Sequence, residues 1–427
     1  MSESFSLSRA QHERSKLTLA GGVATAFRAG QLPVPITFQR GEGAHVYDID
    51  GRGYVDYALG FGPLLLGHSP APVLDAVRAQ LATGLGYGAS HPLEAELSEA
   101  ICRTVPSAEL CVFGSTGSEA VHAAIRIARG ATGRTRVIKF LGHYHGWLDP
   151  IYVGVAGQSG GAPVTGGQDE QAAAATTVCG WNDLDELRRH LGGDVAAVIM
   201  EPINVNAGCI PPAPGYLAAV RELTRSAGAV LIFDEVITGF RVALGGAQEL
   251  YGVKPDLTVL GKALGAGFPI SAVCGTREVM ETVASGRVGH VGTFNANPVC
   301  CAAALAAVRY LERERQELYP RLAATTDQLA AILSEESAGS GVPIQVNATV
   351  GAAHAFVAPG PVRDYADTLS ADREAYRRLA AALLDHEVHV IPRGLLYVST
   401  EHGPAELEAT RAAVRGALRA AHAAMSG

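Results

Sequence analysis

The sequence predicts an α/β fold with a large domain on a mostly parallel sheet and a smaller α+β domain. The chain has 427 residues, which is enough for two domains, and its 48% apolar content allows a sizeable core. Between residues 70 and 310, short apolar runs alternate with helical patterns, as is typical of crossover units in a parallel sheet. These runs are 109–113, 135–140, 195–200, 229–233, 256–260 and 271–274.

The segments on either side of this region predict the smaller domain. Residues 44–58 predict a β-hairpin with its turn at Asp50 and Gly51. A long helical region at 297–336 is followed by strands near 353–357 and 388–399 and by helices near 370–386 and 404–424. We therefore predict an N-terminal arm and hairpin at 1–69 that belong to the small domain, a large domain at 70–315, and the rest of the small domain at 316–427.

The stretch 154–175 is rich in glycine and alanine and has no periodicity. A long segment of this kind inside a compact domain is usually functional or disordered. We predict either a mobile lid near the site or a disordered loop.

Charge and composition exclude several classes of function. The net charge of −8, with acids and bases mixed along the chain, provides no basic stripe for nucleic acid or anionic membranes. We expect small molecules and a second copy of the chain as partners. No apolar run is long enough to span a bilayer and the N-terminus lacks a signal-peptide core, so we expect a cytoplasmic protein. The seven cysteines are scattered without a CxxC pair, which argues against disulfides and a metal site.

Two strand ends carry the main chemical signal. Lys262, in GKALGAG, follows the apolar run PDLTVL, and Asp234 ends the apolar run in LIFDEVITGFR. Both side chains would lie at the sheet edge where open α/β sheets bind ligands. A neutral lysine can form a Schiff base with an aldehyde, and an acid can keep a pyridine nitrogen protonated. Together they predict pyridoxal 5'-phosphate as the cofactor. Taken singly, the lysine is more typical of a solvated loop, and the acid is more typical of a helix cap.

A phosphate site is predicted where FGSTGSEA (113–120) follows a strand and opens a helix. Thr116, Gly117 and Ser118 would present hydroxyl and backbone N–H groups at the helix N-terminus. The alternative is an ordinary N-cap at Thr116 or Ser118 with Glu119 in the first turn.

Other polar residues at strand ends suit an aromatic ligand. Tyr144, in GHYHGW, can lie flat over a ring while the neighbouring glycines let the backbone come close. Glu201 and Asn206, in EPINVNAG, can order the site and hydrogen-bond a ring hydroxyl, and Thr293, in VGTFNANP, is a candidate second phosphate donor. Core packing of the tyrosine and simple turns at the other positions are the alternatives.

In this order, the motifs resemble the class III family of pyridoxal-phosphate-dependent aminotransferases, which have fold type I, and in particular its glutamate-1-semialdehyde 2,1-aminomutase branch. The resemblance runs from residue 21 to the C-terminal helix. It implies a seven-stranded sheet, Lys262 as the Schiff-base lysine and Asp234 as the partner of the pyridinium nitrogen. Tyr144 would stack on one ring face and Val236 on the other. It also implies a homodimer in which Thr293 reaches the cofactor of the other subunit. The chain departs from the family at the phosphate loop, which reads Ser-Thr-Gly-Ser instead of Asn-Ser-Gly-Thr.

Three arginines are candidates for binding a substrate carboxylate. Arg28 matches the arginine that grips it in the family, and Arg40 matches one used by related β-amino-acid aminotransferases. Arg393 lies in IPRGLLYVS, near the place where the aminomutase carries a glutamate that this chain lacks. Arginine suits the task because its planar fork binds a carboxylate through two hydrogen bonds. A surface salt bridge is the alternative for each.

The predicted function is ping-pong transfer of an amino group from a carboxylate-bearing amino acid to an oxo acid. Three alternatives stay open at this stage. The first is intramolecular amino transfer of the glutamate-1-semialdehyde aminomutase type, and the second is a racemase with the same cofactor. The third is a cofactor-binding regulatory or scaffold protein without turnover.

Overall fold

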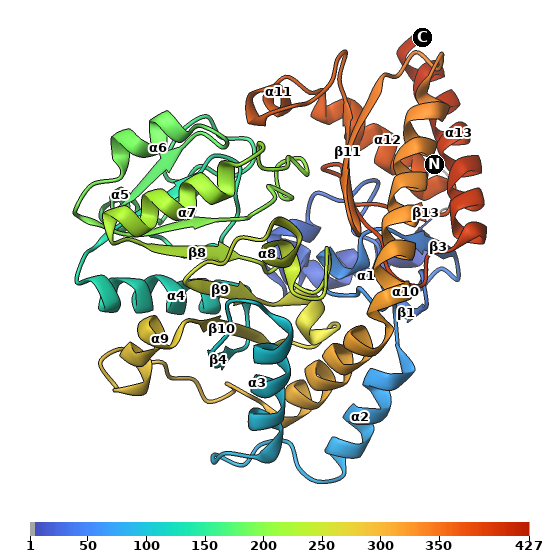
Figure 1. The fold of residues 1–427 in the computed structure, drawn as a ribbon. Coiled ribbons are helices and arrows are strands. Elements are labelled where there is room, and N and C mark those ends of the chain that lie inside the picture. Colours follow the sequence, from blue (N-terminus) through green and yellow to red (C-terminus); the bar gives the residue numbers. More distant parts are fainter. Residues whose placement is uncertain (1–4, 427) are drawn as a thin grey trace.

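The structure is a computed structural model and describes residues 5–426. Its larger lobe holds a seven-stranded sheet in the order β4-β10-β9-β8-β7-β5-β6 (Figure 1). Neighbouring strands are parallel except β10, which runs antiparallel to both β4 and β9. The strands are β4 (Leu110–Gly114), β5 (Arg136–Phe140), β6 (Thr176–Cys179), β7 (Val195–Met200), β8 (Val230–Asp234), β9 (Leu257–Leu260) and β10 (Ser271–Gly275). The predicted α/β fold with a mostly parallel sheet is confirmed, and β6 is a strand that the sequence did not predict.

Helices cover both faces of this sheet, which explains why its strands are continuous apolar runs. All six residues of β7 are buried. Helices α4 (Gly117–Thr132) and α9 (Arg277–Ala284) pack on one face, and α6 (Leu184–His190) and α7 (Tyr216–Ala227) pack on the other (Figure 1).

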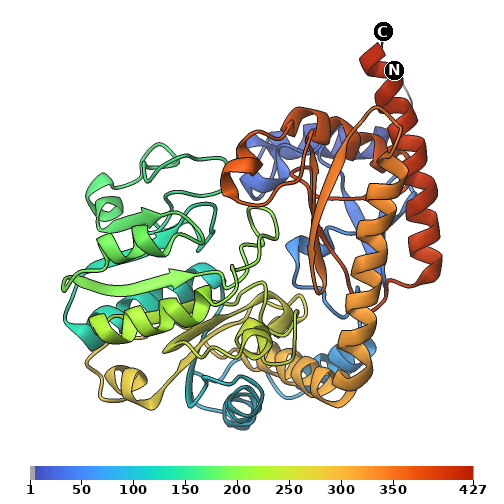
Figure 2. The same ribbon diagram turned by 45° about the horizontal axis from the view of Figure 1, so that its top comes forward.

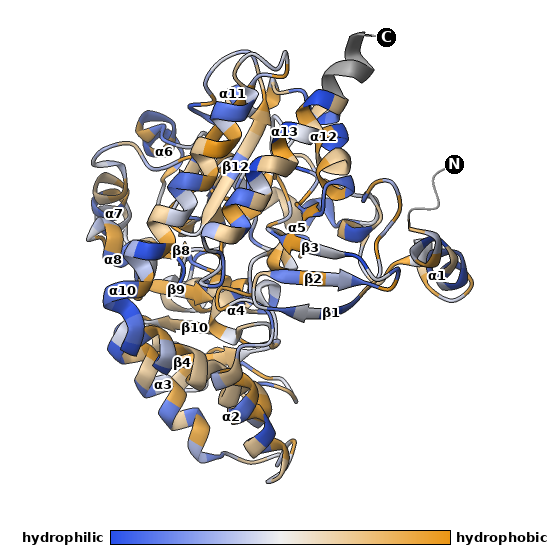
Figure 3. Cartoon of the chain, turned by 90° about the vertical axis from the view of Figure 1, so that its right-hand side faces the viewer, coloured by the Kyte–Doolittle hydropathy of each residue, from blue (hydrophilic) through white to orange (hydrophobic). Residues whose placement is uncertain are grey.

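The smaller lobe joins the two ends of the chain. One sheet has the order β1-β2-β3-β13, and β1, β2 and β3 lie side by side in it (Figure 3). Its parallel β3–β13 pairing links the N-terminal hairpin to the C-terminal part (Figure 1). The predicted hairpin is present as β2 (His45–Asp48) and β3 (Gly53–Asp56), with β1 (Phe38–Glu42) added at its edge. The other strands are β13 (Val388–His389) and, in a second sheet, β11 (Ile344–Thr349), β12 (Ala352–Val357) and β14 (Leu395–Tyr397). The exact domain bounds stay a prediction, and residues 1–4 and 427 lie outside the described residues.

Helix α10 (Pro298–Ser337) confirms the long helical region predicted at 297–336, and it runs through both lobes. It changes direction on its way (Figures 1 and 2), and Pro320 inside it removes one backbone donor. The remaining helices are α1 (Ser6–Lys16), α2 (Ala71–Leu81), α3 (Pro92–Thr104), α5 (Glu170–Ala174), α8 (Gly246–Tyr251), α11 (Tyr365–Leu369), α12 (Arg373–Asp385) and α13 (Pro404–Ser426). None of the helices described is long and apolar enough to cross a membrane.

The segment 154–175 has more structure than its composition indicated. It contains the short helix α5, and its Pro163 forms a β-bridge with Val153, the residue just before the segment. The Tyr365 hydroxyl of α11 donates to the carbonyl of Gln158 at 2.6 Å and accepts from the N–H of Gly157 at 3.0 Å. The first residues of the segment are therefore docked on the small domain. Motion of the segment as a lid stays a prediction.

Candidate active site

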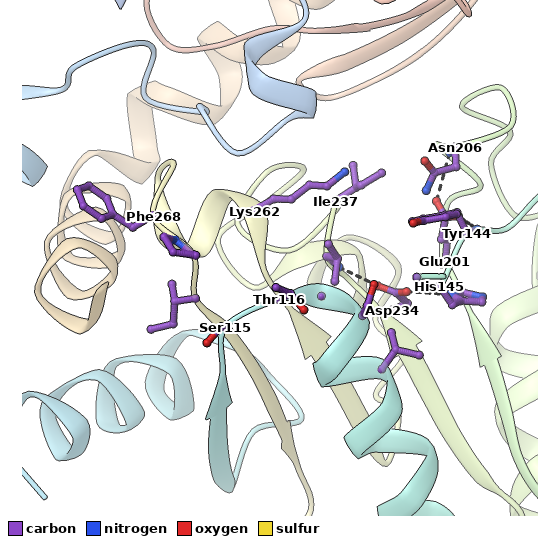
Figure 4. A pocket seen from close by; sticks show the side chains of 17 residues that line it. Ser115, Thr116, Tyr144, His145, Glu201, Asn206, Asp234, Ile237, Lys262 and Phe268 are labelled. Atoms are coloured by element: carbon purple, nitrogen blue, oxygen red, sulfur yellow. Dashed lines mark hydrogen bonds and ion pairs between the residues drawn. The ribbon is translucent and has the colours of Figure 1, made fainter. Parts of the chain in front are cut away.

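Polar residues that follow five strands meet at one edge of the large sheet. Strands β5, β7, β8 and β9 are parallel, and β4 has the same direction because both it and β9 are antiparallel to β10. Their carboxyl ends surround a cavity of about 250 Å³ (Figure 4). Among the predicted site residues, those that line it are Thr116, Gly117, Ser118, Tyr144, Glu201, Asn206, Asp234, Val236 and Lys262.

Lys262 extends into this cavity from the turn after β9 (Figure 4). Burial, and after it the nearby Arg393 guanidinium, lower the pKa of its amine to about 7, against the opposing effect of Glu201 and Asp234. Its φ of 42° is in the left-handed region, which is rare for residues other than glycine and often found at functional sites. An amine with this pKa is largely available as a nucleophile near neutral pH.

Asp234 lies at the end of β8 and is buried. Its Oδ2 is 2.7 Å from His145 Nδ1, and its Oδ1 accepts from the N–H of Val236 at 3.1 Å. Burial raises the pKa of this carboxyl to about 7, because Lys262 and Lys139 only partly offset the cost of burying its negative charge. A protonated pyridine nitrogen is a cation of the kind that this buried acid would stabilise. The sequence analysis did not single out His145, although it is the second histidine of GHYHGW.

Glu201 connects the segments after β5 and β7. Its two carboxylate oxygens accept from the backbone N–H of Tyr144 at 2.8 Å and of Asn206 at 3.2 Å. Its own N–H donates to His143 Nδ1 at 2.9 Å. Burial raises the pKa of Glu201 to about 7. Glu201 therefore fixes the backbone of Tyr144 and Asn206, whose side chains are predicted to contact the cofactor ring.

Lys139, on β5, is a second buried cation that the sequence analysis missed. Its side chain is fully buried, and Nζ donates to the carbonyls of His143 at 2.9 Å, Ile151 at 3.3 Å and Val153 at 2.5 Å. Burial lowers its pKa to about 7, while Glu201 and Asp234 raise it. The signal was a lysine inside the apolar run VIKFL, since lysine is rarely buried without partners. It holds the loop that carries Tyr144 and His145.

The N-terminus of α4 forms another part of the cavity wall. Thr116 is the N-cap of a capping box with Glu119, whose N–H donates to Thr116 Oγ1 at 3.3 Å. The alternative of an ordinary N-cap is therefore correct for the Thr116 hydroxyl. Across residues 5–426, the N–H groups of Gly117 and Ser118 and the Ser118 hydroxyl have no protein partner, although they line the cavity. These donors at a helix N-terminus fit a phosphate group.

Two glycines let the walls of the cavity approach each other. Gly146 has a φ of 90°, and a Cβ there would lie 2.6 Å from Ser118 Oγ. Gly117 packs against Val236, since a Cβ on it would lie 3.3 Å from Val236 Cγ2. The Tyr144 loop, the phosphate end and Val236 are therefore held close together around the space for the ring.

The three predicted arginines lie in two places. Arg393 donates from Nη1 to the carbonyl of Asn206 at 2.6 Å and from Nη2 to Asn206 Oδ1 at 3.2 Å, so it lies beside the cavity. Arg28 and Arg40 instead line a larger cavity of about 670 Å³ under the N-terminal arm. The two spaces adjoin, because Phe27, which also lines the larger one, has its ring centroid 6.3 Å from that of Tyr144.

Arg40 and Thr293 are not at the cavity within this chain. Arg40 pairs with Glu42 at 2.5 Å, and its guanidinium lies 3.7 Å from the ring centroid of Tyr47, as the salt-bridge alternative described. Thr293 is exposed and does not line the cavity.

The fold and the site define a class of protein. A partly buried lysine with a lowered pKa, an acid that lacks a cation, a tyrosine and an anion cradle surround one cavity at the carboxyl edge of the sheet. This set fits the aldehyde, pyridine nitrogen, ring and phosphate of pyridoxal phosphate. It is the arrangement of a pyridoxal-phosphate-dependent enzyme of fold type I.

Comparison with known proteins identifies the family. The family described as Aminotransferase class-III matches residues 26–375. The glutamate-1-semialdehyde 2,1-aminomutase of Desulforudis audaxviator is 41% identical over 94% of this chain and 95% of its own length. An ω-transaminase from Sphaerobacter thermophilus is 36% identical, with a TM-score of 0.92 over 98% of both chains. A transaminase solved with pyridoxal phosphate bound is 29% identical, with a TM-score of 0.92 over 100% of both chains. The chain belongs to the class III aminotransferase family, and its cofactor is pyridoxal phosphate.

Proposed function

We propose that the protein is a transaminase that moves an amino group from a carboxylate-bearing amino acid to an oxo acid. The observation that carries this proposal is the place of Arg393, whose guanidinium lies beside Asn206 and lowers the pKa of Lys262. Within the described residues, Glu201 and Asp234 are the only acids that line the cavity, and both are engaged by neighbouring groups. Among the described residues Arg393 has no ion-pair partner, and a guanidinium of this kind beside the reacting amine favours a substrate with a carboxylate near its amino group.

The residues of the chain divide the chemical work. Pyridoxal phosphate, when bound, supplies an aldehyde that amines attack and a ring that accepts an electron pair. Lys262 would hold the cofactor between turnovers and would be a free amine once the donor is bound. Its Nζ then takes the proton from the donor carbon that bears the amine and later returns a proton, which requires a pKa near neutrality. Asp234 stabilises the positive charge on the ring nitrogen, and His145 and the N–H of Val236 keep its carboxylate oriented.

Intramolecular transfer of the glutamate-1-semialdehyde aminomutase type is the second candidate. The names of the curated relatives, at 41% identity, support it more directly than they support transamination. The similarity to an ω-transaminase supports the first candidate. An aminomutase must keep its intermediate in the site, whereas a transaminase releases an oxo product before the second substrate binds.

One experiment separates the two candidates. The protein is prepared with pyridoxamine phosphate and mixed with a panel of oxo acids and with glutamate 1-semialdehyde, while the cofactor absorption is followed. We expect rapid conversion to the pyridoxal form by at least one oxo acid. Reaction with the semialdehyde alone would establish the aminomutase. Lys262→Ala should show neither the spectrum of lysine-bound cofactor nor turnover, and wild-type rates in that variant would refute both candidates.

We also propose that the protein acts as a homodimer with shared sites. Thr293 is exposed and outside the cavity of its own chain, and it is flanked by Val291, 90% exposed, and Phe294, 72% exposed. Apolar side chains this exposed favour an interface between subunits. Such an interface would let Thr293 reach the phosphate in the partner.

A further inference from the structure

In the proposed reaction, the Lys262 amine must carry a proton at a place that opposes positive charge. Burial lowers the pKa of this amine to about 7, and the guanidinium groups of Arg393 and Arg241 also lower it. In the part of the chain that the structure describes, Nζ has no hydrogen bond and no ion pair. The ammonium form of Lys262 therefore lacks a direct counter-charge, and another group must offset its cost.

The ring of Tyr397 is the group that lies next to this amine. Lys262 Nζ is 5.7 Å from the ring centroid, within the ~6 Å at which the face of an aromatic ring attracts a cation. Figure 4 shows Lys262 extending toward Ile237, and Ile237 and Tyr397 belong to the same apolar cluster. Such surroundings strengthen the attraction, because water does not compete for the charge.

The position of this ring is fixed from several sides. Tyr397 is fully buried on β14, and its N–H donates to the carbonyl of Tyr57 at 2.8 Å. A Cβ on Gly62 would lie 2.9 Å from Tyr397 Cζ, so the backbone of Gly62 lies close against the ring. The guanidinium of Arg241 is 4.9 Å from the ring centroid and donates to the carbonyl of Gly351 at 2.9 Å. The ring therefore presents a fixed surface to the amine.

The hydroxyl of Tyr397 is not the part that acts on Lys262. Among residues 5–426, this buried hydroxyl has no hydrogen-bond partner. Burial raises its pKa to about 12, so it stays neutral and cannot take up a proton from the substrate near neutral pH. What remains is the face of the ring, which attracts a cation through its electron distribution and needs no charge of its own.

We infer that the face of the Tyr397 ring is the resting place of the Lys262 amine while this amine carries the proton. An N–H bond forms on Nζ as the C–H bond of the substrate breaks, and the proton later leaves Nζ for the carbon that receives it. Between these two events the ring stabilises the ammonium group and keeps it at the cavity. Tyr397 is thus a positioning residue that acts through Lys262. The inference rests on the proposed function, from which it takes this proton transfer.

The test measures the charge on Lys262 in the full chain without turnover. The pH midpoint for attachment of pyridoxal phosphate to the apoprotein is compared between variants. Tyr397→Met keeps an apolar side chain but removes the ring face, so the ammonium form is less stable and the midpoint should move down by about 0.5–1 pH unit. Tyr397→Phe keeps the ring and removes a hydroxyl without a partner, so the midpoint should stay near that of the wild type and the melting temperature should not fall.

Tyr376→Met is the matched control, because it makes the same replacement at another buried tyrosine, on α12. It should leave the midpoint unchanged. Two results would overturn the inference. One is a folded Tyr397→Met with the midpoint of the wild type. The other is a shift of equal size in Tyr397→Phe or in Tyr376→Met, which would assign the effect to the hydroxyl or to general packing.

A second variant keeps the test decisive if Tyr397→Met does not fold. Tyr397→pentafluorophenylalanine retains the shape of the ring but reverses the charge of its face, so its midpoint should lie below that of Tyr397→Phe. Equal midpoints in these two variants would overturn the inference. Failure of the proposed function is a separate outcome. If neither an oxo acid nor glutamate 1-semialdehyde reacts with the wild type while the midpoint still depends on the ring, the proposed function fails and the contact between ring and ammonium is retained.

Discussion

At the scale of single residues, the charge on Lys262 decides when the protein can take up its cofactor. Burial lowers the pKa of its amine to about 7, and only the neutral amine attacks an aldehyde. The amine is protonated below this pH and neutral above it. The rate at which the apoprotein attaches pyridoxal phosphate should therefore rise through about pH 7 and then level off. Stopped-flow absorbance across the pH range checks this, and a rise centred near the pKa of an ordinary lysine would contradict it.

Arg393→Met provides an internal check on this pH profile. The Arg393 guanidinium is the second cause that lowers the pKa of Lys262, so its removal should move the midpoint to higher pH. The same variant loses the contact with Asn206, which changes the shape of the site but not the direction of this shift. A midpoint that stays in place would mean that burial alone sets the pKa.

The sequence predicted residues whose chemical type is itself informative. Lys262 and Asp234 were identified because an amine and an acid at neighbouring strand ends suit one cofactor. His145 and Lys139 were not, because their roles depend on contacts across the sheet. Lys139 Nζ reaches the carbonyl of Val153, 14 residues away along the chain. Such a contact depends on how the loop after β5 folds back, and no local pattern encodes that.

At the scale of elements, Tyr365 fixes the start of the segment 154–175. Tyr365→Phe should lower the local stability of this loop by about 1–2 kcal/mol, since the carbonyl of Gln158 and the N–H of Gly157 lose their partner while the ring remains. Amide hydrogen exchange at Gly157 should become faster, with little change in global unfolding. Tyr319→Phe is the matched control, because its hydroxyl bonds the distant carbonyl of Phe240. Equal exchange in wild type and Tyr365→Phe would show that other contacts hold the loop.

Element prediction succeeded where burial is uniform and missed two edge strands, β6 and β11. The fully buried run of β7 and the long pattern of α10 were predicted nearly to their ends. Strand β6 lies at the edge of its sheet and is short, and β11 is mostly half-buried, so neither gives a clear apolar run. The antiparallel direction of β10 was also beyond the sequence, because direction depends on the connection and not on the composition of the strand.

At the scale of the whole molecule, the site is shaped by parts far apart in the sequence. The parallel β3–β13 pairing joins the arm that carries Arg28 to the segment that leads to Arg393. The chain length allowed a second domain, and the N-terminal arm was predicted to belong to it, but the pairing of β3 with β13 could not be predicted from local periodicity. The cavity under the N-terminal arm, which Arg28 and Arg40 line, adjoins the cofactor cavity because this pairing brings the two ends of the chain together.

The quaternary structure should also contribute to the site. We expect the double variant Val291→Asp and Phe294→Asp to be monomeric, because two charges would have to be buried in the proposed interface around Thr293. It should also lose cofactor more readily, since no partner Thr293 would reach the phosphate. Sedimentation velocity and the cofactor released on dialysis measure the two effects, and circular dichroism confirms that the subunit stays folded. Leu369→Asp, at an apolar residue that is 40% exposed on α11, should remain dimeric. A double variant that stays dimeric would place the interface elsewhere, and a monomeric one with normal cofactor retention would show that each subunit binds its phosphate alone.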